Sequence, residues 1–386
     1  MKLLVLTGTL YPQLGNNAVL VGKLIPYLLV AGHEVHLLSF AFGEKEAELP
    51  ATSISVPVHW VTDQNRDWKR RLLFPVVSWL FDRKGYSDVL QLLIVLRKLK
   101  ELQKVHSFDT LLPTLEPFSM ACAASCFRSK NTVLFIMDPP IYSANNPRNR
   151  YRIRMLKRIL IHSSLLVSTP FIQKALRSNN FNLPDSTLWV GFPAITPNRV
   201  KMPFRNDSRI HLLFCGWLYS DIRSPKYFLN ILSRLDERFV VIFMGRECEK
   251  LTERFDVQTK AELITLPQQP YETALQAMAD ADIMINIGNS VPVHMPSKTL
   301  EYINTGKPFV NFYKMDDCPT LYYSKRYPLC LNLSEQDPDI DAAAQRFIEF
   351  CIDNKGKTVD RAFIESEYAD CTPEYIAHKI LDALGE

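Results

Sequence analysis

The amino-acid sequence predicts an α/β protein made of two Rossmann-like domains, and three observations support this prediction. Short apolar runs rich in β-branched residues alternate with amphipathic stretches, as in parallel sheets whose connections are helices. The chain has 386 residues, which is enough for two domains with a core each. A polar stretch with three prolines (Pro193, Pro197 and Pro203) separates two such alternating halves and is the best linker candidate.

The composition is that of a folded soluble protein, with 47% hydrophobic and 22% charged residues. A net charge of +4, from 45 basic and 41 acidic residues, is too small to indicate a nucleic-acid partner. Eight cysteines are scattered without a CxxC pair or a zinc-finger spacing, which favours a reducing cytoplasm. Residues 1–6 are too short for the apolar core of a signal peptide, and the longest apolar stretches fall short of a membrane span.

The first half opens with an apolar strand at residues 2–7, a loop containing Gly15, and a helix at residues 18–30. A second strand follows from His33. A strand, a glycine-containing loop, a helix and a strand in this order are typical of nucleotide-binding α/β domains, although the GxGxxG motif is absent. A tight turn that needs a glycine is nearly as good an explanation of Gly15.

Acidic residues follow two later strands of the first half. Asp138 comes directly after the strand at 131–137, at the carboxyl edge where α/β sheets place ligands. Turn chemistry before Pro139 explains this aspartate equally well. Glu116, in the loop after the preceding strand, is the weaker candidate. The strands expected in this part of the chain are residues 109–112, 131–137, 165–168 and 188–190.

Two basic segments of the first half, residues 66–84 and 148–158, indicate contact with an anionic membrane surface. In each, lysines and arginines flank or precede apolar residues, as in an interfacial membrane anchor. A solvated basic face is the alternative for either segment alone. The residues expected to contact the membrane or the acceptor are Trp68, Arg70, Arg71, Trp79, Arg150 and Arg154.

The second half continues the alternation and contains the stretch with the strongest chemical signal, residues 283–313. An apolar strand leads into a polar turn, a helix that starts at Ser297, and a second strand. The helix start offers backbone N–H groups and a positive dipole to an anion, and Lys298 adds a full charge. Glu301 lies one turn in, where it can accept hydrogen bonds from sugar hydroxyls. We therefore predict a site for a sugar-linked diphosphate, with an ordinary well-capped βαβ unit as the alternative.

The segment PSKTLEYINTGKPFV, residues 296–310, resembles the nucleotide-sugar signature of the retaining GT-B glycosyltransferases of the large family-four group. The resemblance implies that Glu301 holds the donor ribose and that Ser297, Lys298 and Thr299 hold the diphosphate. Many members carry a second glutamate that binds the donor sugar, and Val293 stands at its position here. In this chain the contact with the donor sugar would then come from a polar neighbour such as Asn289 or His294.

A second segment, GWLYSDIRSP at residues 216–225, fits the same resemblance. In the family, a glycine after this strand precedes an arginine, and a lysine follows six residues later; both reach the donor phosphates. Here Gly216 precedes Trp217, and Arg223 stands at the lysine position. A guanidinium can bind phosphate in bidentate fashion. The charge missing at Trp217 would come from Lys226 or Lys298. The alternative interpretation of Arg223 is that it is an ordinary surface arginine at a helix start.

The resemblance spans nearly the whole chain. It implies a GT-B fold, with an acceptor-binding domain at residues 1–195 and a nucleotide-sugar-binding domain at residues 208–371 facing a central cleft. The C-terminal helix at 372–386 would return to the first domain. It also implies that Gly15 approaches the donor phosphates or the acceptor, and that Asp138 lies near the acceptor and the departing phosphate.

The implied function is transfer of a sugar from a nucleoside diphosphate sugar, with UDP-sugars favoured, to a lipid-linked or saccharide acceptor. The setting would be bacterial surface polysaccharide synthesis in the cytoplasm, on the inner face of the plasma membrane. Asp138, Arg223 and Lys298 are the candidate catalytic residues, and no cofactor or metal is expected because no DxD-type motif is evident. Another GT-B enzyme such as a sugar-nucleotide epimerase, or a catalytically silent nucleotide-sugar-binding assembly subunit, is the alternative.

Overall fold

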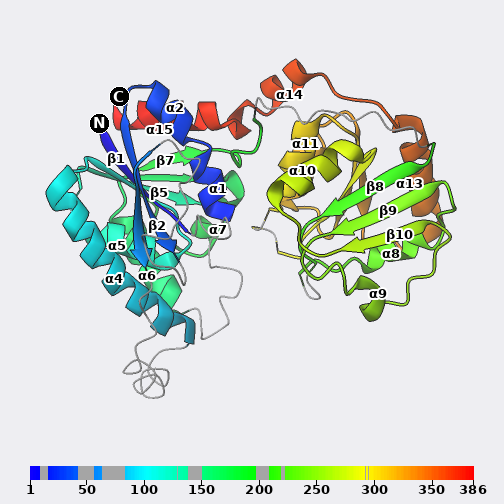
Figure 1. The fold of residues 1–386 in the computed structure, drawn as a ribbon, viewed down its shortest axis with the longest axis horizontal. Helices are drawn as coiled ribbons and strands as arrows, with labels where there is room; N and C mark the ends of the chain where they lie inside the picture. The colour runs from blue at the N-terminus through cyan, green and yellow to red at the C-terminus, as the bar shows by residue number, and fades with distance from the viewer. Residues whose placement is uncertain are drawn as a thin grey trace. The chain divides into compact units, whose positions relative to one another are not determined.

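A computed structural model describes the chain over residues 1–8, 16–41, 56–62, 83–127, 129–137, 150–196, 208–218, 222–291, 293 and 295–386. The chain forms two compact units. The first contains Met1–Pro193 together with Asp370–Glu386, and the second contains Ala194–Ala369. Each unit is a parallel sheet flanked by helices (Figure 1).

The first unit is built on a seven-stranded sheet with the order β3-β2-β1-β4-β5-β6-β7. The order reverses between β1 and β4, so the loops that follow these two strands leave the sheet at its topological switch point. The strands are β1 (Lys2–Leu6), β2 (Glu34–Ala41), β3 (Val58–Thr62), β4 (Thr110–Pro113), β5 (Asn131–Ile136), β6 (Leu165–Ser168) and β7 (Ser186–Trp189). The helices are α1 (Asn16–Gly22), α2 (Ile25–Val30), α4 (Arg83–His106), α5 (Phe118–Cys126), α6 (Arg150–Ile161), α7 (Pro170–Ser178) and α15 (Pro373–Leu384).

The single helix expected at residues 18–30 is in fact two helices, α1 and α2. The break falls just before Pro26, which occupies the first turn of α2. Proline has no backbone N–H and its ring clashes with the preceding turn, so it starts a helix readily but does not continue one. Glycine at position 22 closes α1 before this break.

The second unit has a six-stranded sheet with the order β10-β9-β8-β11-β12-β13, in which the switch point lies between β8 and β11. The strands are β8 (Ile210–Cys215), β9 (Phe239–Met244), β10 (Glu262–Leu266), β11 (Ile283–Ile287), β12 (Phe309–Tyr313) and β13 (Cys330–Ser334). The helices are α8 (Lys226–Leu232), α9 (Leu251–Arg254), α10 (Tyr271–Asp280), α11 (Lys298–Thr305), α12 (Pro319–Ser324), α13 (Ile340–Asn354) and α14 (Arg361–Glu367).

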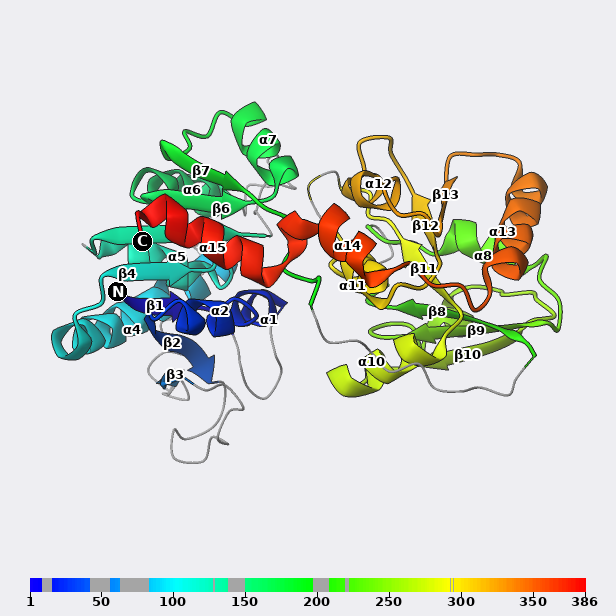
Figure 2. The ribbon, with the colours of Figure 1, turned by 90° about the horizontal axis from the view of Figure 1, so that it is seen from above.

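The C-terminal helix α15 returns to the first unit, as the sequence predicts, and packs against α2 and β7 (Figure 2). The returning segment, which starts at Asp370, contacts the first unit at Gly191, whose N–H donates to the carbonyl of Asp370 at 2.9 Å. A Cβ atom on Gly191 would lie 2.1 Å from the sulfur of Cys371, so only glycine allows the approach. The apolar face of the helix is buried through Ile376 and Ile380.

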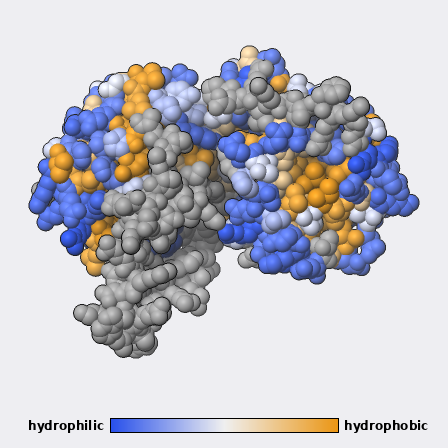
Figure 3. Space-filling view, viewed as in Figure 1, coloured by the Kyte–Doolittle hydropathy of each residue, from blue (hydrophilic) through white to orange (hydrophobic). Residues whose placement is uncertain are grey.

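The face of the molecule in Figure 3 is largely hydrophilic, with apolar side chains gathered in a few places on each unit. Among the large apolar side chains of the described residues, Val30, Val105, Ile161 and Trp189 are the most exposed. Of the helices that the structure describes, none is long and apolar enough to cross a membrane.

Candidate functional site

The loops after β8 and β11 form the candidate site of the second unit. The two strands are neighbours at the switch point, paired through Ile283 with Leu212 and Met284 with Leu213. Their carboxyl ends therefore bring the segment after Cys215 next to the segment after Ile287. This is the place where open parallel sheets bind ligands.

A buried arginine joins these two loops. Arg223 donates from Nε to Oδ1 of Asn289 at 2.8 Å, across 66 residues of sequence, and from Nη1 to the carbonyl of Trp217 at 3.3 Å. The backbone N–H of Ser290 donates to the carbonyl of Ile222 at 2.9 Å. Arg223 is only 7% exposed and Asn289 only 1%. The arginine predicted to bind the donor phosphates is thus oriented by a buried amide.

The first turn of α11 presents a close ion pair. Lys298 donates from Nζ to Oε2 of Glu301 at 2.5 Å, and the two side chains are 24% and 16% exposed. Ser297 is the N-cap residue, and its side chain makes no capping hydrogen bond. The helix start therefore combines its dipole with a cation and a carboxylate that lie together at the switch point.

Thr299 was expected to contact the diphosphate, but its side chain lies in the interior. It is fully buried, and its hydroxyl donates to Oδ1 of Asn286 at 3.1 Å. Its backbone N–H donates to the carbonyl of Pro296 at 3.1 Å. The reason is the helical period, because positions 299 and 303 lie on the same face of α11, and both side chains are buried.

Three asparagines, of which Asn286 and Asn311 are buried, continue this contact as a ladder across the sheet. Asn286 of β11 aligns with Asn311 of β12, which aligns with Asn332 of β13. Asn286 donates from Nδ2 to Asn311 at 2.7 Å, and Asn311 donates from Nδ2 to Asn332 at 2.8 Å. Through Thr299, the ladder fixes the start of α11 to the strands beneath it.

Replacing Asn311 by alanine is expected to lower the free energy of unfolding by about 2–4 kcal/mol. Asn311 is fully buried, and its loss leaves the Asn286 amide without its acceptor, which costs about 1–3 kcal/mol. It also removes the hydrogen bonds that Asn311 donates to Asn332 and Ser324, each of which contributes about 0.5–1.5 kcal/mol. Denaturant unfolding measures the change. Asn230→Ala, at an exposed position of α8, is the control and is expected to stay within about 0.5 kcal/mol of wild type. Equal stability of the two variants would show that the ladder is not structural.

Several residues that the sequence does not single out also shape this site. The hydroxyl of Tyr302 accepts from the N–H of Cys215 at 2.9 Å and donates to its carbonyl at 3.1 Å, which ties α11 to the end of β8. Burial raises the pKa of Tyr302 well above its usual value, so the hydroxyl stays protonated. Gly245, after β9, has φ +140°, and a Cβ there would lie 1.8 Å from the Gly216 carbonyl oxygen. The sequence signal for this close approach is a glycine directly after the apolar strand β9.

A second ion pair holds the loop that carries Arg223. Lys314 donates from Nζ to the carbonyl of Ser224 at 3.3 Å and pairs with Glu335. Both partners are largely buried, with side chains 16% and 12% exposed. Burial raises the pKa of Glu335, and the nearby Lys314 opposes the shift. Neither residue belongs to a local sequence pattern, so only the fold reveals the contact.

Positive charge lies beside Trp217, the residue that replaces the arginine of the resembled family. Trp217 is 38% exposed, and the guanidinium carbon of Arg246 lies 4.3 Å from the centre of its ring, within cation–π range. Arg246 follows β9, the neighbour of β8, so it stands at the same carboxyl edge. Lys226, predicted as one source of the missing charge, is an exposed residue at the start of α8.

In the first unit, the switch point between β1 and β4 carries Glu116. Its carboxylate pairs with Nη1 of Arg152 at 3.0 Å, and its backbone carbonyl accepts from the hydroxyl of Thr114 at 2.8 Å. The weaker of the two acidic candidates is therefore held by an arginine of α6. Gly15 and Asp138 lie outside the described residues, as does His294.

The basic surface predicted for membrane contact is described in part. Trp68, Arg70, Arg71 and Trp79 lie outside the described residues, as does the side chain of Arg150. Along the rest of α6, the apolar residues Leu156, Ile159 and Leu160 are fully buried. Arg154 and Arg158 are exposed, and so is Ile161 at the end of the helix.

Comparison with known proteins places this arrangement among solved folds. No protein-family model matches the chain, and no curated sequence matches it. Solved structures match over the full length. The sucrose-phosphate synthase tll1590 from Thermosynechococcus elongatus has 12% identity and a TM-score of 0.69, and the match covers 100% of this chain and 98% of that chain.

Two further structures also match over the full length of the chain. Alr3699/HepE from Anabaena, in complex with UDP and glucose, has 16% identity and a TM-score of 0.65, covering 100% of this chain and 99% of that one. The lipopolysaccharide outer core galactosyltransferase WaaB has 12% identity and a TM-score of 0.60, with coverage of 100% and 99%. The two parallel-sheet units and these full-length matches give the chain the GT-B fold, as the sequence predicts.

Proposed function

We propose that this chain is a glycosyltransferase that moves a sugar from a nucleoside diphosphate sugar, a UDP-sugar in preference, with retention of configuration at the anomeric carbon. The observation that carries the proposal is the convergence of Arg223, Asn289, Lys298 and Glu301 at the switch point of the second unit. The full-length likeness to a GT-B protein in complex with UDP and glucose supports the choice of donor.

In the proposed complex the donor diphosphate lies at the start of α11. Arg223, held by Asn289, and Lys298 bind its oxygens, and the helix dipole adds to their field. Arg246, stacked on Trp217, supplies the further charge that an arginine provides in the resembled family. Glu301 accepts from the ribose hydroxyls, so Lys298 turns from Glu301 toward the diphosphate when the donor binds.

The transfer itself is proposed to proceed on one face of the sugar. The bond between the anomeric carbon and the diphosphate oxygen breaks, and the acceptor oxygen forms its bond to the same carbon from the same side. The acceptor hydroxyl proton passes to the leaving diphosphate. Arg223 and Lys298 stabilise the negative charge that grows on the diphosphate, so we propose that the transfer needs no bound metal.

The proposed acceptor is a lipid-linked or saccharide hydroxyl, as in bacterial surface polysaccharide synthesis, with Asp138 beside it. The chain would then work at the cytoplasmic face of a membrane. Support comes from α6, where Arg154 and Arg158 are exposed on one side while the opposite side is buried in the core. Exposed Ile161 adds an apolar residue to this basic face.

The variant Arg154→Gln/Arg158→Gln is expected to bind phosphatidylglycerol vesicles about 30-fold more weakly than wild type. Each basic side chain near an anionic surface contributes about 1 kcal/mol. Vesicle co-sedimentation at low and physiological salt measures the change, and wild-type binding should weaken as salt rises. The control, Lys174→Gln/Arg177→Gln, removes two exposed charges of α7 in the same unit. Equal loss in both variants would mean that charge alone, and not this face, governs binding.

A thermal-shift panel tests the donor site. UDP-, GDP- and ADP-sugars are added to wild type, Glu301→Ala, Arg223→Ala and the control Glu272→Ala. Like Glu301, Glu272 is an acidic residue in the first turn of a helix, but it belongs to α10 and not to α11. A ligand of the native state raises the melting temperature of wild type and the control. The donor-site proposal fails if no nucleotide sugar stabilises wild type, or if both site variants respond as wild type does.

A catalytically silent nucleotide-sugar-binding subunit is the second candidate. Val293 and Trp217, which stand where the resembled family has a glutamate and an arginine, favour it. Donor hydrolysis measured beside donor binding separates the two, because a silent subunit binds the donor without releasing the nucleoside diphosphate. A sugar-nucleotide epimerase would release a different sugar product from the same donor.

A further inference from the structure

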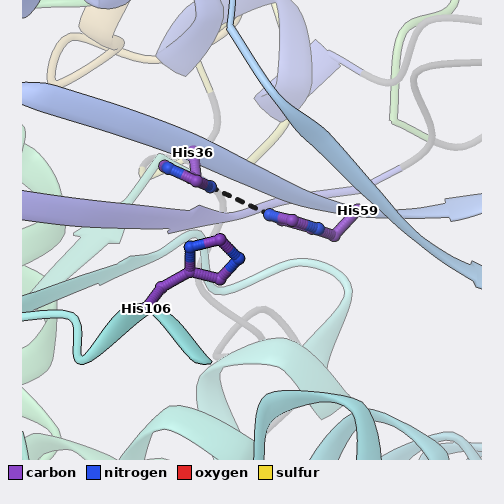
Figure 4. Close-up of side chains that lie close together, drawn as sticks. All are labelled: His36, His59 and His106. Carbon is purple, nitrogen blue, oxygen red and sulfur yellow. Dashed lines mark hydrogen bonds between the residues drawn. The ribbon is translucent and has the colours of Figure 1, made fainter. Parts of the chain in front are cut away.

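Three histidines gather at the edge of the sheet of the first unit, whereas the donor site proposed above belongs to the second unit. His36 lies on β2, His59 on the edge strand β3, and His106 in the last turn of α4 (Figure 4). Each offers one ring nitrogen, and the three nitrogens lie within 4.8 Å of one another. We propose that these residues bind one divalent transition metal ion of the zinc class. This inference is independent of the proposed function.

The strand register places the first two rings on one face of the sheet. His59 of β3 aligns with Leu38 of β2, and side chains two residues apart on a strand share a face. His36 therefore points to the same side as His59, the side that α4 covers through Val95 and Leu99. In Figure 4 the ring of His106 faces the other two from the end of its helix.

The carboxylate of Glu34 orients the first ligand. His36 Nε2 lies 2.9 Å from Oε1 of Glu34, and His36 Nδ1 lies 2.9 Å from Nε2 of His59. The contact with the carboxylate fixes the ring so that Nδ1 faces the neighbouring histidine. A histidine whose outer nitrogen donates to a carboxylate is the usual arrangement at protein metal sites.

The spacing is close to that of a metal site. Zinc–nitrogen bonds of about 2.0–2.1 Å in tetrahedral geometry separate the ligand nitrogens by about 3.3 Å. On metal binding the His36–His59 pair at 2.9 Å would open slightly, and the His106 nitrogen would approach by about 1.5 Å or less. Imidazole nitrogen is a ligand that suits zinc, nickel and copper.

The position of the cluster indicates a structural role for the ion. His36 and His59 lie near the amino ends of their strands, whereas the switch point of this sheet is at the carboxyl ends. An ion bound there would join β2, the edge strand β3 and the end of α4. An edge strand is hydrogen-bonded to a neighbour on one side only, so a bond through the metal would hold β3 to the sheet more firmly.

Titration with Co²⁺ tests the proposal on full-length, tag-free protein that has been treated with a chelator. Co²⁺ bound to imidazole absorbs visible light, and Zn²⁺ competes it away. Wild type and the control His378→Gln, at an exposed position of α15, should bind one equivalent. His59→Gln and His106→Gln should bind at least about 100-fold more weakly, and Glu34→Gln about 10- to 100-fold more weakly.

The Glu34→Gln variant controls for loss of binding through misfolding, because it keeps all three rings while removing the carboxylate that orients one of them. Circular dichroism of each metal-free variant verifies the fold, and Zn²⁺ should raise the melting temperature of wild type but not of His106→Gln. The proposal is overturned if wild type binds neither ion, or if His59→Gln and His106→Gln bind Co²⁺ as tightly as wild type.

Discussion

Replacing Glu301 by alanine is expected to lower kcat/KM for donor hydrolysis about 100- to 10,000-fold. In the proposed complex this carboxylate accepts from two ribose hydroxyls, and each hydrogen bond to a charged group contributes about 1.5–3 kcal/mol. The side chain is 16% exposed and lies in the first turn of α11, beside Lys298. Hydrolysis is the suitable assay because it needs no acceptor, and calorimetric titration with UDP should show the same loss of affinity.

Two further variants make this prediction specific. Glu301→Gln keeps an acceptor oxygen but loses the charge, so its loss should be smaller, about tenfold. Glu272→Ala removes a carboxylate from the first turn of α10 and should keep wild-type activity. Unchanged donor affinity in Glu301→Ala would remove this residue from the donor site.

Replacing Arg223 by alanine is expected to lower kcat about 100- to 1,000-fold. The guanidinium is proposed to stabilise the charge that grows on the leaving diphosphate, and removal of one such preorganised donor has an effect of this size in other enzymes. Preorganisation is visible in the fold, since Asn289 accepts from Nε at 2.8 Å and the Trp217 carbonyl accepts from Nη1 at 3.3 Å. Steady-state hydrolysis at saturating donor measures the change.

Arg223→Lys separates charge from geometry. A lysine keeps one positive charge but offers neither the planar fork nor the Nε–H that Asn289 binds, so it should recover about tenfold of the lost rate. Arg234→Ala, an exposed arginine just after α8, is the control. If Arg223→Ala raises KM alone and leaves kcat unchanged, the residue binds the ground state and the transition state equally, and the proposed selective stabilisation of the transition state is contradicted.

The sequence predicts the core of the second unit well because its signals there are local. The expected strand from Ile283 is β11, the expected helix from Ser297 is α11, and Gly306 ends that helix in the left-handed conformation, with φ +79°. Apolar runs, a helix-start residue and a glycine followed by proline act over a few residues each. They can therefore be read without knowledge of the fold.

The contacts that orient the site could not be predicted in the same way. The partner of Arg223 is Asn289, and the partner of the Thr299 hydroxyl is Asn286 on the strand beneath it. Each pair depends on which strands are neighbours, and sequence spacing does not give this. The histidine cluster is a stronger case, since its members lie on two strands and a helix and share no motif.

The most direct measurement is a crystal structure of the protein with the nucleoside diphosphate that raises its melting temperature most. The account predicts diphosphate oxygens within hydrogen-bond distance of Arg223 and Lys298, and ribose hydroxyls on Glu301, with the Lys298–Glu301 pair opened. A nucleotide bound away from the ends of β8 and β11, with that pair intact, would contradict the proposed donor site.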